Sequence, residues 1–204
     1  MTKKRKVLII IFALVFITGA VLGFLYFNKD HEKVVVIKQE DIIKDYNYTI
    51  KETDSKLKKD LFNELKEILS SDDIDYDNYA KKLAEIFTVD VYDLNSKINK
   101  YDVGGLEYIL EEKKEVFKQV LQDSLYSNIK DNSNNNRNQK LPVVKKVTAQ
   151  DLKTSNYSYN GNKYDSYIIN VVIDYEKDLG YDKDISVEMI KKDNKLFVVK
   201  VSPN

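Results

Sequence analysis

An uninterrupted apolar stretch near the N-terminus constrains this chain more than any other feature of its sequence. Residues 7–27 read VLIIIFALVFITGAVLGFLYF and include no charged side chain. A helix rises about 1.5 Å per residue, so this stretch would span roughly 30 Å, the thickness of the hydrocarbon core of a bilayer. We therefore predict that residues 7–27 form a transmembrane helix in contact with the lipid bilayer.

The residues before this stretch predict its orientation. Residues 1–6 include four basic side chains and no acidic one: Lys3, Lys4, Arg5 and Lys6. Positively charged flanks stay on the cytoplasmic side of the cell membrane. We expect residues 1–6 to form a cytoplasmic tail, and residues 28–204 to lie on the extracytoplasmic side of a single-pass protein.

A cleaved signal peptide is the alternative interpretation. The small residues Thr18, Gly19 and Ala20 offer a cleavage point for a signal peptidase. The apolar region of a signal peptide is usually about 7 to 15 residues long, whereas here apolar residues continue through Val21–Phe27. The length of the stretch favours the anchor, and the chain has no cysteine to carry a lipid instead.

Charge and composition narrow the class of partner. Four of the 33 basic residues precede the apolar stretch and none of the 33 acidic ones does, so the remainder has 29 bases against 33 acids, a charge of −4. Nucleic acids and anionic wall polymers prefer a basic surface, so we expect no nucleic-acid partner. Only two of the 33 basic residues are arginine, a bias typical of an A/T-rich bacterial genome.

Residues 28–53 are charged and irregular, and we expect them to form a stalk or linker, with the only histidine, His31, exposed to solvent. An α+β domain is expected to follow over residues 54–204. In its helical part, residues 54–130, apolar side chains recur with the 3.6-residue helical period. We predict a first helix from Asp54 or Ser55 to about residue 69, a second over 76–99, and a third over 106–129 after the Gly104-Gly105 turn.

The period then changes to two residues, which is typical of strands. Residues 131–140 contain five asparagines and are predicted to be a flexible loop. Strands are predicted in residues 141–201: from 143 to between 148 and 157, then 164–175, 185–191 and 196–201. Asn160-Gly161 is a strong hairpin signal between the first two. The expected fold is three helices on a curved antiparallel sheet of about four strands.

This order of elements, over about residues 54–201, resembles the cone-shaped fold of nuclear transport factor two. With an N-terminal membrane helix, the chain is similar to the single-pass scaffold subunits of conjugation and type IV secretion systems. The resemblance implies an extracytoplasmic domain that binds other envelope proteins or self-associates. It lies in element order and hydrophobic pattern, so it assigns no site residue.

Gly19 and Gly23 form a GxxxG pattern inside residues 7–27. Two glycines four positions apart allow two membrane helices to pack closely, so this pair is a candidate for helix association. Chance is the alternative, because glycine is common in membrane helices.

Two further candidates lie in the outer part. Asp73, Asp75 and Asp77 resemble the first half of a calcium-binding loop, although Ala84 stands where a ligating glutamate is needed; the alternative is a loop in which Asp75 or Asp77 caps a helix. Aromatic side chains also gather near the Asn160-Gly161 turn and could form a binding surface: Tyr157, Tyr159, Tyr164 and Tyr167.

The sequence contains no nucleophile elbow, zinc-binding helix or phosphate loop, and no cysteine. We therefore expect no enzyme activity, cofactor or metal. The leading hypothesis is a membrane-anchored protein-binding scaffold. The alternatives are an extracytoplasmic domain that binds a small ligand and, third, a degenerate enzyme that uses a carboxylate pair.

Overall fold

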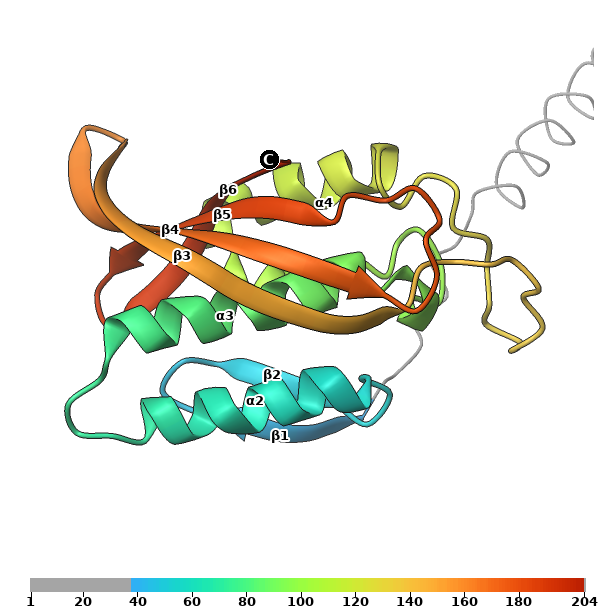
Figure 1. Ribbon diagram of the computed structural model, residues 1–204, viewed down its shortest axis with the longest axis horizontal. Helices are drawn as coiled ribbons and strands as arrows, with labels where there is room; N and C mark the ends of the chain where they lie inside the picture. The colour runs from blue at the N-terminus through green and yellow to red at the C-terminus, as the bar shows by residue number, and fades with distance from the viewer. Residues whose placement is uncertain (1–37, 204) are drawn as a thin grey trace, which may run out of the picture. The chain divides into compact units, whose positions relative to one another are not determined.

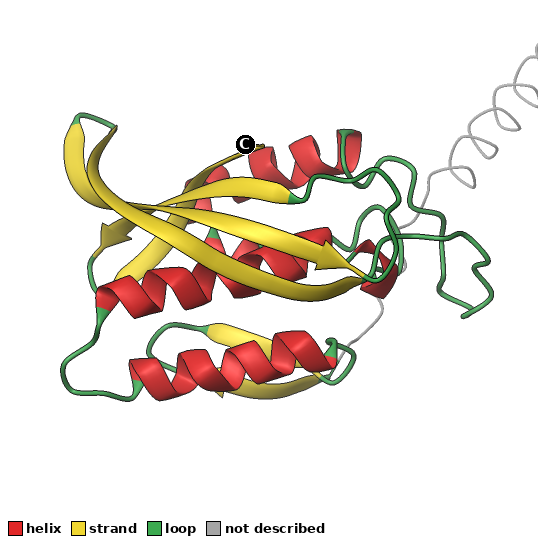
Figure 2. Cartoon of the chain, in the orientation of Figure 1, coloured by secondary structure: helices red, strands yellow, loops and turns green. Residues whose placement is uncertain are grey.

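The computed structural model describes residues 38–203, which form an α+β fold (Figures 1 and 2). This part of the chain contains three α-helices, a four-stranded antiparallel sheet and a separate two-stranded hairpin. The predicted class, number of helices and antiparallel sheet are therefore confirmed. The elements are β1 (Gln39–Ile43), β2 (Tyr48–Lys51), α2 (Lys56–Leu69), α3 (Tyr76–Tyr92), α4 (Lys114–Asp123), β3 (Val144–Tyr159), β4 (Asn162–Tyr175), β5 (Asp184–Lys192) and β6 (Lys195–Pro203), with short 3-10 turns at Leu94–Ser96, Leu106–Tyr108 and Glu111–Lys113.

The four-stranded sheet follows the order of the sequence, β3-β4-β5-β6, so every connection is a hairpin. The turn between β3 and β4 has Asn160 at φ 49° and Gly161 at φ 78°. Two successive residues with positive φ are what a two-residue hairpin requires, so the predicted Asn-Gly turn is confirmed.

Strand β4 shows why the sheet packs on one face only. Ile169, Val171 and Ile173 are buried, whereas the alternate residues Ile168 and Val172 are half-buried. Successive side chains of a strand point to opposite faces. The buried set faces α3, which lies along β3 and β4 (Figure 1), and the strand predicted over 164–175 is confirmed.

Helix α2 begins where its sequence predicts. Ser55 is the N-cap, and its Oγ accepts a hydrogen bond from Lys58 N–H at 3.2 Å. An N-cap side chain satisfies one of the four backbone N–H groups that the first turn leaves unbonded. Leu61, Leu65 and Leu69 then form a buried stripe facing the core.

The second and third helices are shorter than predicted. Helix α3 ends at Tyr92 instead of residue 99, because Asn95 N–H donates to Pro142 O and Ile98 N–H to the Asp102 carboxylate. Of the helix predicted over 106–129, only α4 (Lys114–Asp123) is α-helical. Ile109 is extended and forms a bridge with Val198 of β6. These turn and tertiary contacts replace helical hydrogen bonds, so the bounds predicted for both helices are wrong.

The expected stalk is wrong for residues 39–51, which form the β1–β2 hairpin. Tyr46, Tyr48 and Ile50 alternate along this segment and are buried in the main core. Asn47 turns the chain at φ 53°. Burial of two tyrosines stabilises the hairpin against α2 and α3, so the folded part begins earlier than predicted.

The loop predicted over residues 131–140 is present, and Arg137 is one of the side chains that hold it. Arg137 donates from Nη1 to Lys97 O and from Nη2 to Asn95 O, both at 2.8 Å. The guanidinium fork presents several donors in a fixed geometry. Arg137 therefore ties the loop to the segment that follows α3.

Two glycines allow the cost of backbone strain to be separated from the cost of overpacking. Gly105 and Gly161 have nearly the same φ, 79° and 78°, but a Cβ at Gly105 would lie 2.8 Å from Val91 Cγ2, whereas at Gly161 nothing lies within 4 Å. Gly161→Ala should lower the free energy of unfolding by about 1–2 kcal/mol, from backbone strain alone. Gly105→Ala should cost a further ~1–3 kcal/mol from overpacking. Urea unfolding measures both, and equal losses would contradict the packing argument.

Candidate functional site

The candidate site is an open apolar groove of about 680 Å³ between α4 and β6. Its floor comes from Phe87 and Val91 of α3, one wall from α4, and the other from Val198–Pro203 of β6. We call it the α4–β6 groove. Its apolar lining also includes Tyr92, Ile109, Leu110, Val116, Phe117, Val120, Leu121 and Leu125.

Helix α4 packs on the core incompletely. Phe117 and Leu121 are partly buried against the core, but none of the helix's residues is fully buried. Val116 and Val120, one turn apart, are 62% and 56% exposed. An exposed apolar pair on the wall of an apolar groove is a candidate interaction surface, which a lone exposed valine would not be.

Strand β6 is the edge of the four-stranded sheet. Leu196 N–H donates to the Tyr79 hydroxyl, and Leu196 O accepts from the Tyr48 hydroxyl, each at 3.2 Å. Val198 is bridged by Ile109. Edge strands expose backbone donors and acceptors that can pair with another chain, and here the first half of the edge is occupied by the protein itself.

The predicted tyrosine surface is only partly assembled. Tyr157 and Tyr159 line the α4–β6 groove, and Lys113 Nζ lies 5.3 Å from the centre of the Tyr159 ring. Tyr164 is opposite Tyr157 across the hairpin. Tyr167 falls on the other face of β4, packed against the core. The structure therefore brings two of the four tyrosines to the groove.

The polar lining of the groove is sparse. Its charged residues are Lys113, Lys200 and Asp182, and its hydroxyls include Ser124 and Ser202. A single carboxylate offers a metal too few ligands, and within residues 38–203 no group of three His, Cys, Asp or Glu side chains could hold a metal ion. The lining suits apolar contacts with a few polar ones at the rim.

Asp75 caps helix α3, as the alternative to calcium binding predicts. Its Oδ1 accepts hydrogen bonds from Asp77 N–H at 3.0 Å and Asn78 N–H at 3.1 Å, and its Oδ2 accepts from Asn78 Nδ2 at 2.8 Å. Both carboxylate oxygens are thus bonded to the first turn of the helix. Residues 73–78 make a capped helix start.

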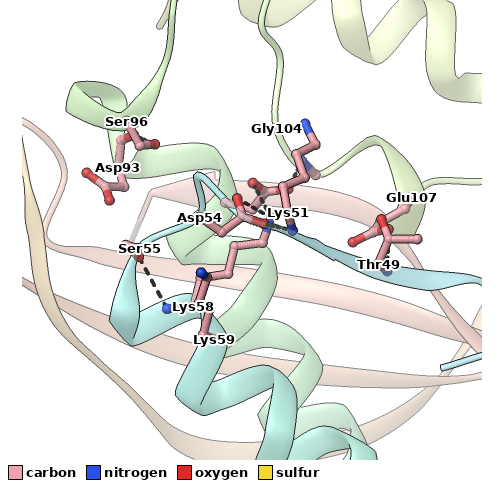
Figure 3. Close-up of polar contacts among 12 residues, drawn as sticks. Thr49, Lys51, Asp54, Ser55, Lys58, Lys59, Asp93, Ser96, Gly104 and Glu107 are labelled. Carbon is pink, nitrogen blue, oxygen red and sulfur yellow. Dashed lines mark hydrogen bonds and ion pairs between the residues drawn. The ribbon is translucent and has the colours of Figure 1, made fainter. Parts of the chain in front are cut away.

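A buried ion-pair network lies where the first and second helices meet the Gly104-Gly105 turn (Figure 3). Asp90 Oδ1 contacts Lys58 Nζ at 2.8 Å and Lys97 Nζ at 3.3 Å, and Oδ2 accepts from Gly105 N–H at 2.7 Å. Lys58 also contacts Asp54 at 3.2 Å. Lys58 and Lys97 are only 4% and 6% exposed. A lysine on an amphipathic helix usually lies on its solvent-exposed face, so the burial of Lys58 departs from what the helical pattern of α2 predicts.

The charges of this network compensate one another. Burial alone would raise the pKa of Asp90, but Lys58, Lys97 and the Gly105 N–H outweigh it and hold that pKa well below its usual range. Burial likewise disfavours the charged lysines, yet Asp90 raises the pKa of both. Two carboxylates and two ammonium groups satisfy one another, so the network joins the start of α2, the end of α3 and the turn at Gly105.

Asp93 is a buried carboxyl group whose surroundings disfavour its charged form. It is 4% exposed, and within residues 38–203 its Oδ1 has no hydrogen-bond partner. Burial raises its pKa to about 6, although Lys97 opposes the rise. A perturbed carboxyl is a frequent sign of a functional site, but Asp93 does not line the α4–β6 groove.

The sequence carries only a weak local signal for the groove, because its walls come from segments far apart in the chain. The helix predicted over residues 106–129 would have Val120 on its apolar face, whereas the structure leaves Val120 56% exposed. The neighbouring pairs Val116-Phe117 and Val120-Leu121 do carry a signal, because two adjacent apolar stripes are wider than one packed face needs.

Comparisons with known proteins give no relative: no protein-family model, no curated protein and no solved structure matches this chain. Within residues 38–203 no helix is long and apolar enough to cross a membrane. The predicted anchor at residues 7–27, its Gly19 and Gly23, and His31 lie outside the described residues.

The ion-pair network predicts a large loss of stability on removal of its central charge. Asp90→Asn would leave two buried ammonium groups without their main partner, so the free energy of unfolding should fall by roughly 3–5 kcal/mol. Asp60→Asn is the matched control, because Asp60 pairs with Lys56 on the surface. Its unfolding should stay close to wild type in urea titrations. A small effect of Asp90→Asn would show that the lysines find other partners.

Asp93 predicts a pH dependence of stability. The pKa of Asp93 is raised in the folded state, so the folded protein holds the proton of this carboxyl group more tightly than the unfolded chain does. The contribution of the protonated carboxyl to the free energy of unfolding is therefore fully present below about pH 4 and is lost as the pH rises through about 6. Asp93→Asn should therefore raise the free energy of unfolding by roughly 1–3 kcal/mol at pH 8 and change it little at pH 4. The exposed Asp165→Asn variant should follow wild type at both values. A gain of equal size at both pH values would exclude the ionisation of Asp93 as its cause.

Proposed function

We propose that this chain is a single-pass cell-membrane protein whose extracytoplasmic domain binds another protein in a bacterial envelope assembly. The observation that carries the proposal is the α4–β6 groove, with Val116 and Val120 exposed on its wall. Exposed apolar side chains that rim a groove of a folded domain are typical of protein-binding surfaces. The apolar stretch 7–27 and its basic flank support the anchor and its orientation.

The arrangement of the folded part also supports a scaffold role. Helices that precede an antiparallel sheet suit the cone-shaped class of folds, which the sequence resembles, and within it the scaffold subunits of conjugation and type IV secretion systems. In this proposal Gly19 and Gly23 let the membrane helices associate, while the α4–β6 groove engages the partner. Self-association and partner binding then use different parts of the chain.

Binding of a small ligand is the second candidate, favoured by the size of the groove. A volume of about 680 Å³ falls within the range of roughly 300–1,000 Å³ found for ligand pockets. A pocket that binds a small ligand usually encloses most of the ligand's surface. The α4–β6 groove, in contrast, is open and continues onto the exposed face of α4, so it suits a larger partner better.

Site-specific photo-crosslinking in intact membranes distinguishes these functions. A photoreactive residue at Val116 in the full chain should yield a discrete product of higher mass, either with a partner protein or with a second copy. The same residue at Leu179, which is 39% exposed but lies outside the groove, should yield none. If neither position gives a protein adduct, protein binding by the groove is wrong and the small-ligand function gains support.

A further inference from the structure

We infer that the α4–β6 groove takes an extended segment of the partner, which pairs with β6 as a fifth strand. This inference rests on the proposed function and specifies how the partner is held. It follows from the direction of the backbone groups in β6, from the helix that walls the groove, and from the charges at its rim.

The hydrogen bonds of β4 and β5 show which groups of β6 face outward. Ile173 N–H donates to Lys183 O at 2.8 Å, and an antiparallel ladder alternates between residues bonded to one neighbour and to the other. Val187, four residues after Lys183, therefore also bonds toward β4. Val201 is opposite Val187, so the N–H and C=O of Val201 point away from β5.

The protein's own residues occupy the first half of this free edge and leave the second half open. The backbone N–H and C=O of Leu196 form hydrogen bonds with two tyrosine hydroxyls, and Val198 forms an isolated β-bridge with Ile109. Within residues 38–203 no group forms a hydrogen bond with the outward N–H or C=O of Val201. Residues 199–203, roughly 17 Å of strand, line the groove.

Helix α4 determines what kind of partner can reach this edge. It lies beside β6 (Figure 1) and forms the opposite wall of the groove. The edge of a second folded sheet would meet α4 before it reached β6, whereas a single extended chain needs only about 4.8 Å beside the strand. Addition of one peptide strand to a sheet edge is an established mode of recognition, in which main-chain bonds give affinity and side-chain pockets give specificity.

The lining specifies the chemistry of that segment. Phe87, Val91 and Phe117 favour apolar side chains at alternate positions. The rim has two lysines, Lys113 and Lys200, against one carboxylate, so an acidic residue in the segment is favoured. The chain's own apolar run at residues 34–37 is flanked by Lys33 and Lys38, which disfavours it as the occupant. The occupant is therefore an extended, apolar segment with an acidic residue, supplied by another protein.

A peptide titration on the full chain in detergent micelles tests the inference. The probe is a labelled seven-residue peptide of alternating valine and threonine with one central glutamate. Its matched controls carry lysine in place of glutamate, or N-methyl groups on alternate peptide bonds. Fluorescence anisotropy should show binding of the first peptide, weaker binding of the lysine form, and a loss of at least tenfold for the N-methylated form.

Two variants of the chain complete the test. Val201→Pro removes an outward N–H that bonds nothing in the fold, and proline is tolerated at such edge positions; it should weaken binding at least tenfold. Val120→Asp changes the α4 wall and should also weaken it. If Val201→Pro misfolds, the N-methylated peptide on the unaltered chain decides the question.

The outcomes separate this inference from the proposed function. Equal binding of the N-methylated peptide would overturn strand addition while protein binding by the groove remained. No peptide binding, together with a crosslinked partner at Val116, would overturn the extended segment alone. Self-association that Val201→Pro abolishes, with no peptide binding, would assign the edge to a second copy and would also overturn the inference.

Discussion

The carboxylate of Asp90 is the contact on which the rest of the fold depends. It joins Lys58 at the start of α2, Lys97 after α3 and the Gly105 N–H of the following turn. Gly105 in turn packs on Phe87 and Val91, the two residues that form the floor of the groove. A buried charge cluster of this kind contributes little net stability but penalises every arrangement that separates its members. It therefore fixes the position of the groove floor.

The groove lies between the most and the least firmly packed helices of the described residues. Helix α3 is buried against the sheet along most of its length, whereas α4 has no fully buried side chain. Elements with few buried apolar contacts open at lower free energy than the core does. A rigid floor and a loosely held wall together suit a site that admits a segment of varying sequence.

Local patterns predicted the regular parts of the fold. The stripe of α2, its Ser55 cap, the alternation in β4 and the Asn160-Gly161 turn all agree with the structure, because each is decided by neighbouring residues. Residues 93–99, residues 106–113 and the β1–β2 hairpin were mispredicted, since many of their hydrogen bonds and buried side chains depend on distant partners. The groove was not predicted for the same reason: residues near 90, 118 and 200 meet only after folding.

The hydrogen bonds of Tyr48 join the first described hairpin to the final strand. Its hydroxyl lies 2.7 Å from that of Tyr79 and donates to Leu196 O, 148 positions along the chain. A ribosome makes the chain from one end, so this buried tyrosine is synthesised long before its acceptor exists. Until β6 emerges, the hairpin lacks the partner that completes it. Folding of this domain should thus finish as a single late step, once nearly all of its sequence has been made.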